Sequence, residues 1–181
     1  MLAIAIAACD HTGNPPLASG DAGTPASAAA GSAKPARMTA DGYRDLDWLA
    51  MVPNDELEVV QHPAPVTHVG SLRAQQVGTY RTIATLDGEK VQLAGYIVPL
   101  EADDKGNLTE FFLVPYYGAC IHVPPPPPNQ IVYVKLDKAI EPPEIWDPYS
   151  VKGVLHTRKT ANDVAGSAYT LEQASVKPWE N

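Results

Sequence analysis

Five consecutive prolines, Pro124 to Pro128, limit the conformations of this chain more than any other feature. They follow the run Tyr116-Tyr117-Gly118-Ala119-Cys120-Ile121-His122-Val123. Prolines donate no backbone hydrogen bond and fix φ, so we expect a polyproline II rod of roughly 15 Å, at about 3.1 Å per residue. The sequence therefore predicts an ordered surface segment that forms a rigid wall beside a thiol and an imidazole.

Cys120 and His122 are two positions apart, and residues i and i+2 of an extended strand point to the same face. Thiolate and imidazole are ligands that suit zinc or copper. Zinc needs three or four ligands, and His156 is our first choice for the third because it ends a predicted strand. His62, His68 and the carboxylates are other candidates. The pattern predicts a soft-metal site.

Other interpretations of the same residues stay open. Cys120 could simply be packed in the core, because cysteine is among the most buried residue types. It could also be the nucleophile of a thiol enzyme, although only Asn129 lies near enough in sequence to orient a base. A third interpretation is an interaction module, in which a partner recognises the prolines or the tyrosines pack on them. The wall in these interpretations comprises Tyr116, Tyr117, Gly118, Pro124, Pro125, Pro126, Pro127, Asn129 and Gln130.

The N-terminus has the form of a lipoprotein signal. Residues 1–9 end in Ile6-Ala7-Ala8-Cys9, an aliphatic residue and two small residues before a cysteine. The preceding apolar stretch is short and has no basic residue, so we interpret the start codon as assigned too far downstream. A lipid on Cys9 would anchor the chain to a membrane and place it in the periplasm. Asp10 resembles a signal for retention at the inner membrane. With Cys9 lipidated, Cys120 has no intramolecular disulfide partner.

Residues 10–40 are rich in Ala, Gly, Ser, Thr and Pro and contain no aromatic or β-branched aliphatic residue. Such a segment buries too little apolar surface to offset its ordering entropy, so we expect a disordered tether. Residues 41–181 are then long enough for one domain. The net charge of −8 lies in this domain, which argues against nucleic acid as a partner.

The domain shows mainly strand signals. A short amphipathic helix is expected over residues 41–51, and residues 61–70 are expected to be an irregular connection. Strands are predicted over residues 91–100, 108–114, 131–134, 150–156 and 168–176, with a hairpin turn at 103–107. Gly95 and Gly153 would let the strands bend. We therefore predict a mostly-β fold: a small five-stranded bent sheet or OB-like barrel with a short N-terminal helix. A two-layer sandwich is the alternative.

Three blocks of the chain carry a resemblance to a known family. They are residues 95–101 (GYIVPLE), 108–115 (LTEFFLVP) and 118–127 (GACIHVPPPP) with Asn129 and Gln130. Together with the segments 153–155 and 169–171, they resemble the bacterial domain-of-unknown-function family 3299. The resemblance implies a periplasmic lipoprotein or secreted protein, in some cases linked to transporter genes that respond to metal supply. It implies no catalytic activity.

The sequence thus predicts a periplasmic, lipid-anchored protein that binds zinc or copper beside a transport system. The expected partners are the membrane, through the N-terminal lipid, and a transporter of the ABC type. Nothing in the sequence resembles a nucleotide-binding loop or a serine nucleophile elbow.

Overall fold

The computed structural model describes residues 37–62, 75–120, 123 and 125–180. They belong to one compact unit, Lys34–Asn181. The predictions for Cys9, for the tether up to residue 36, and for His68, His122 and Pro124 lie outside the described residues. Among the helices of the described part, none is long and apolar enough to cross a bilayer.

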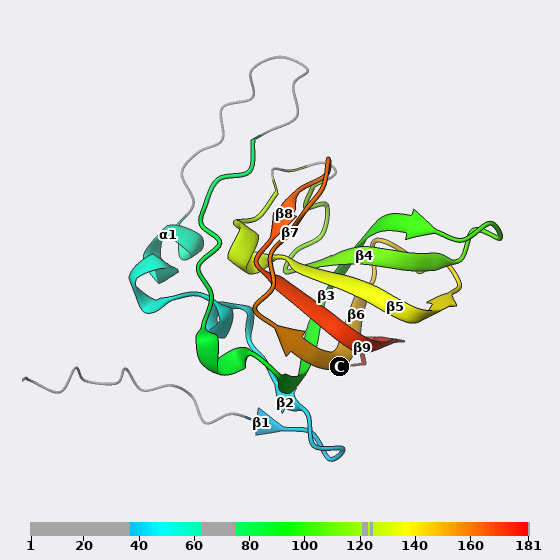
Figure 1. Ribbon diagram of the computed structural model, residues 1–181, viewed down its shortest axis with the longest axis horizontal. Helices are drawn as coiled ribbons and strands as arrows, with labels where there is room; N and C mark the ends of the chain where they lie inside the picture. Colours follow the sequence, from blue (N-terminus) through cyan, green and yellow to red (C-terminus); the bar gives the residue numbers. More distant parts are fainter. Residues whose placement is uncertain (1–36, 63–74, 121–122, 124, 181) are drawn as a thin grey trace, which may run out of the picture. The chain divides into compact units, whose positions relative to one another are not determined.

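Five long strands form a closed barrel (Figure 1). Neighbours follow the order β3-β4-β5-β9-β6, and β6 returns to pair with β3. All these pairs are antiparallel except β5 and β9, which run parallel. Counted along the chain, the order is first, second, third, fifth, fourth, first, which is the connectivity of an OB-like barrel. The predicted fold class is confirmed. The five strands are β3 (Glu89–Ala102), β4 (Leu108–Val114), β5 (Val132–Ile140), β6 (Pro148–His156) and β9 (Tyr169–Pro178).

Strand β3 closes the barrel because it pairs with two different strands, one along its first half and the other along its second half. Its residues 89–96 pair with β6, and its residues 96–102 pair with β4. Gly95 lies where the partner changes, and a Cβ there would stand 2.6 Å from the Val114 carbonyl oxygen and 3.0 Å from Trp48 Cζ2. The irregularity in pairing comes later, between Pro99 and Glu101. Gly95 is therefore required for close approach between segments, rather than for a bulge.

The barrel interior is filled by alternate residues of the five strands, as expected when one face of each strand is buried. Strand β6 shows the pattern most clearly, because every second residue from Tyr149 to Leu155 is buried. Tyr169 is fully buried near one end of the barrel, where its hydroxyl accepts from Ile83 N at 2.7 Å and donates to Met51 O at 2.8 Å. The largest fully buried side chains are Tyr169, Phe111, Phe112, Met51, Leu86, Leu93, Ile97, Leu113, Ile131, Leu155, Leu171 and Val52.

The helix predicted over residues 41–51 is wrong for most of its length. Arg44–Asp45 is a short strand, β2, which pairs with β1 (Arg37–Met38) and runs parallel to β3. Leu46 N extends this pairing with a bond to Gln92 O at 2.9 Å. Pairing with the barrel thus overrides the helical spacing of apolar residues. Only Trp48–Met51 is helical, as a 3-10 turn (η1), and the short α-helix, α1, follows at Leu57–Gln61.

The remaining short elements lie in the connections. A second small sheet pairs β7 (Thr160–Ala161) with β8 (Gly166–Ser167) in the link between β6 and β9. The 3-10 turns are η2 (Asn54–Glu56), η3 (Ala84–Leu86) and η4 (Pro128–Gln130). The predicted turn at 103–107 is confirmed: Asp103 N bonds Asn107 O at 2.9 Å and the Asp103 side chain accepts from two backbone N–H groups.

Candidate functional site

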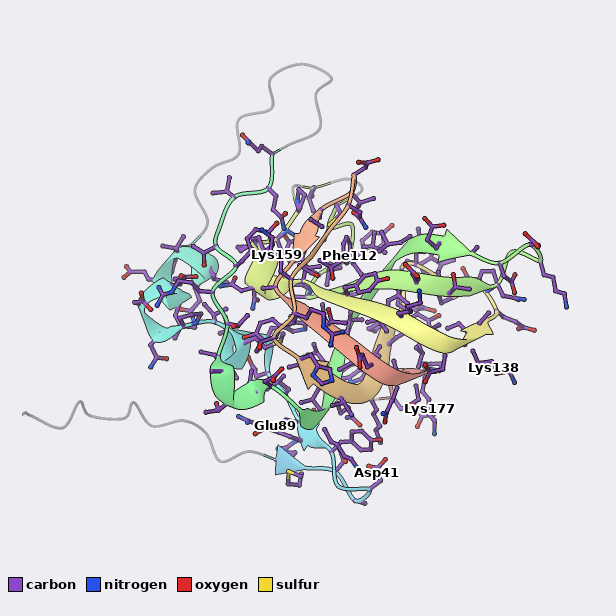
Figure 2. All side chains as sticks on the ribbon, in the orientation of Figure 1. Asp41, Glu89, Phe112, Lys138, Lys159 and Lys177 are labelled. Atoms are coloured by element: carbon purple, nitrogen blue, oxygen red, sulfur yellow. The ribbon has the colours of Figure 1, made fainter. Side chains whose placement is uncertain are left out.

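The connection between β4 and β5 covers the outer face of the barrel, and Cys120 lies in it. We call the residues buried there the outer cluster. Its strand members point away from the barrel interior, because they alternate with the interior residues; Phe112 is labelled in Figure 2. Tyr96, Leu100, Tyr133 and Val164 pack around it. The outer cluster comprises Val98, Phe112, Val114, Ala119, Cys120, Ile131 and Ala165.

Cys120 lies in a turn. Its φ is +65°, in the left-handed region that residues other than glycine seldom adopt. The loop around it is closed by a bond from Val123 N to Gly118 O at 3.1 Å, and Gly118 also has a positive φ, +79°. The extended strand expected to place Cys120 and His122 on one face is therefore wrong at Cys120. The short closed loop results because Gly118 permits the reversal at its start.

The Cys120 side chain is 6% exposed, whereas the two tyrosines that precede it in the connection are more open. Tyr116 and Tyr117 are about half exposed. Burial raises the pKa of Tyr116, and the charge of the nearby Cys120 thiolate adds to that shift. Tyr117 meets Tyr96 edge to face, with 6.0 Å between ring centroids.

The described part of the proline block, residues 125–128, is not a surface rod. Pro125, Pro126 and Pro128 are buried, and Pro128 already belongs to η4. The block is fixed through its carbonyl groups, since Gln76 Nε2 donates to Pro126 O and Ala168 N donates to Pro128 O, both at 2.8 Å. Proline carbonyls keep their acceptor capacity although the ring nitrogen has lost its hydrogen. The described prolines are therefore part of the protein's own packing.

Asn129 and Gln130 are also buried, and they tie the proline block to the N-terminal segments. Gln130 Nε2 donates to Trp48 O at 2.7 Å, and Asn129 Nδ2 donates to Glu56 Oε2 at 2.9 Å. The carboxylate of Glu56 also accepts from the Thr79 hydroxyl and from Arg81. The Nδ2 group of Asn129 is thus already used in a hydrogen bond that holds two segments of the fold together. Sequence reasoning missed Glu56 and Gln76, because partners 73 and 50 positions away leave no local signal.

His156, the predicted third metal ligand, lies on the outer side of β6 in different surroundings. Its Nδ1 is 3.5 Å from Asp87 Oδ1, and its Nε2 is 3.6 Å from Glu172 Oε2. The pKa of Asp87 is lowered, chiefly by the bond from Thr157 N and less by His156. His62 is exposed at the end of α1. Within the described ranges, no group of three or more His, Cys, Asp or Glu side chains is arranged to hold a metal ion.

Comparison with known proteins gives a family. No curated protein matches the chain. The crystal structure of a DUF3299 family protein from Pseudomonas aeruginosa PAO1 is similar to it, with 37% sequence identity and a TM-score of 0.59. The match covers 77% of this chain and 98% of that one. The family model described as "Protein of unknown function (DUF3299)" matches residues 48–178. The chain therefore belongs to the DUF3299 family.

Proposed function

We propose that this protein is a lipid-anchored periplasmic domain that binds a soft metal ion, zinc before copper, for a metal-linked transport system. Cys120 supplies the thiolate, and His122 supplies an imidazole. The protein acts by holding or sensing the ion and carries out no chemical reaction on it. An ABC-type transporter is the expected partner.

The closed loop from Gly118 to Val123 is the observation that carries this proposal. Its ends are joined by a hydrogen bond of 3.1 Å from Val123 N to Gly118 O. Two Cα atoms two positions apart are separated by about 7 Å at most, within reach of one ion bound by both side chains. The left-handed φ of Cys120 means that the backbone is strained at the proposed ligand, and such strain is concentrated at functional sites.

The chemistry of the thiol supports the same proposal. The chain contains two cysteines, and one of them is the predicted lipidation site. In an oxidising compartment a remaining thiol needs burial, ligation or a chemical use. Cys120 is buried against apolar neighbours but lies near the half-exposed Tyr116. An ion would therefore reach the sulfur by displacing side chains at the surface and leaving the barrel interior intact.

The interaction module that used the prolines is the weaker alternative. Pro125, Pro126 and Pro128 are buried, so an aromatic groove on a partner has no access to their rings. In the thiol-enzyme alternative, only the Oδ1 atom of Asn129 is left to orient a base, because Nδ2 donates to Glu56. Neither alternative explains the small closed loop around Cys120.

Equilibrium titration of the metal-free full chain with zinc tests the proposal. We expect about one zinc per chain for the wild type and for a His62→Ala control, which removes an exposed histidine. The Cys120→Ser/His122→Ala variant should lose that binding. His156→Ala should keep it, because both ring nitrogens of His156 already face carboxylates. Equal zinc uptake by the wild type and the double variant would leave Cys120 as a packing residue only.

A further inference from the structure

A hollow of about 240 Å³ opens at the end of the barrel that holds the β3–β4 hairpin. One wall is the β3–β4 hairpin, through residues 99–108, and the other is the link between β5 and β6. The lining is mainly aliphatic, with prolines prominent and Glu101 as the charged member. The side chains that line it are those of Pro99, Leu100, Glu101, Ala102, Leu108 and Ile145, with Pro142, Pro143 and Gly106 completing it.

Two tryptophans are exposed at the same end of the barrel. Trp146 follows the lining residue Ile145 and is 59% exposed. Trp179 is 43% exposed, and its N–H bonds Pro148 O at 3.0 Å, so it lies beside the segment that carries Trp146. Large aromatic side chains left in water next to an apolar hollow are typical of interaction sites.

The two segments that form the walls of the hollow, with the strand residues beside them, account for most of the net negative charge of the chain. Residues 99–108 and 137–148 together hold seven carboxylates and two lysines, a net charge of −5, against −8 for the whole chain. Within the described residues, none of these seven carboxylates is in an ion pair. Lys138 and Lys177 project near the ends of β5 and β9 (Figure 2). Several acidic side chains elsewhere are in ion pairs, as in Arg44–Glu89 and Lys152–Asp41.

From this arrangement we infer that the hollow is a docking site for a basic segment of a partner protein, one that carries an apolar side chain between lysines or arginines. The apolar side chain enters the hollow and leaves water. The cationic groups meet the wall carboxylates that are in no ion pair, and the faces of the exposed tryptophans. An acidic or neutral segment would gain only the apolar contact. This inference does not depend on metal binding at Cys120.

Peptide binding to the full chain tests the inference, with three acetylated and amidated probes of about eight residues. One alternates lysine with leucine, one lysine with serine, and one glutamate with leucine. The lysine–leucine peptide should bind most tightly, alter tryptophan fluorescence, and shift amide resonances of residues 99–108 and 142–147. The lysine–serine peptide should bind at least about tenfold more weakly, because it has nothing to bury. Added salt should weaken the binding of both lysine peptides, because it screens the attraction between the lysines and the carboxylates.

Charge reversal supplies the matched comparison. Glu141→Lys/Glu144→Lys should weaken binding of the lysine–leucine peptide by about tenfold or more. Asp45→Lys/Glu58→Lys makes the same change in net charge at exposed positions away from the hollow and should leave the affinity within about twofold. Equal binding of the glutamate–leucine peptide, resonance shifts confined to other strands, or equal losses in the two charge variants would each overturn the inference.

Discussion

The side-chain amide of Gln76 bonds the backbone of Gly166 in both directions. Its Nε2 donates to Gly166 O and its Oε1 accepts from Gly166 N, each at 2.8 Å. The same Nε2 donates to Pro126 O. The Gln76 side chain therefore bonds β8 in the way that a further strand would, in addition to its pairing with β7, and it also holds the proline block in place.

Replacing Gln76 should destabilise the domain. Gln76→Ala removes three hydrogen bonds to backbone groups, and Gly166 is buried. We expect the free energy of unfolding to fall by about 2–4 kcal/mol, measured by urea denaturation. Gln75→Ala, at the exposed neighbouring position, should change it by less than about 0.5 kcal/mol. A loss at Gln76 no larger than at Gln75 would contradict this role.

A side chain at Gly95 should be poorly tolerated. A Cβ there would stand 2.6 Å from Val114 O, and the backbone of β4 cannot retreat without breaking its pairing with β3. Gly95→Ala should lower the free energy of unfolding by about 1–3 kcal/mol, and Gly95→Val by more. Lys90→Ala, at an exposed site of the same strand, is the control in thermal denaturation. Wild-type stability of Gly95→Val would show that the barrel closes less tightly at this point.

The hydroxyl of Tyr169 should make stability sensitive to alkaline pH. Burial raises the pKa of Tyr169 to about 12 from an ordinary value of 10.0. The folded state thus holds this proton more tightly than the unfolded chain. The resulting stability is fully present below pH about 10 and is lost as the pH rises from about 10 to about 12.

The Tyr169→Phe variant separates this effect from that of the other tyrosines. It should be about 1–3 kcal/mol less stable at neutral pH, because Ile83 N–H and Met51 C=O lose their partner. Its loss of stability between pH 10 and 12 should be smaller than that of the wild type. Tyr43→Phe keeps the aromatic ring that lies 5.4 Å from Lys152 Nζ and should follow the wild type. Parallel alkaline unfolding curves for Tyr169→Phe and the wild type would refute the assignment.

Lipidation of Cys9 should determine where the protein resides. Mass spectrometry of the protein from its own host should find a diacylglyceryl group on Cys9, and Cys9→Ala should move the protein from the membrane to the soluble fraction. Cys120→Ser should stay with the membrane, because that thiol plays no part in anchoring. An unmodified Cys9 in the cytoplasm would end the lipoprotein proposal.

The strands of the barrel were predictable, because their signals are local. Runs of residues that favour strands, separated by turn signals, identified β3, β4, β6 and β9 within a few positions, and Leu108–Val114 coincides with β4. The first part of the helix over 41–51 failed because pairing of β2 with β3 outweighs a weak helical period. The spacing of apolar residues reports only on the segment itself. The strand that pairs with this segment is distant in sequence: Arg44 pairs with Val91, 47 positions later.

The surroundings of Cys120 were predictable only in part. The motif identifies the loop that holds Cys120, but it predicts an extended strand where Gly118 begins a reversal and Cys120 has a positive φ. Burial of the prolines depends on Gln76 and Ala168, which are distant in sequence. A proline run indicates stiffness, whereas its exposure is decided by what the rest of the chain packs over it.

X-ray absorption at the zinc edge of the zinc-loaded full chain tests the metal proposal most directly. We predict one sulfur ligand at about 2.3 Å and nitrogen or oxygen ligands at about 2.0–2.2 Å. The sulfur contribution should vanish in Cys120→Ser and persist in Cys9→Ala. A spectrum without sulfur in the wild type, or one that is unchanged in Cys120→Ser, would contradict a metal site at Cys120.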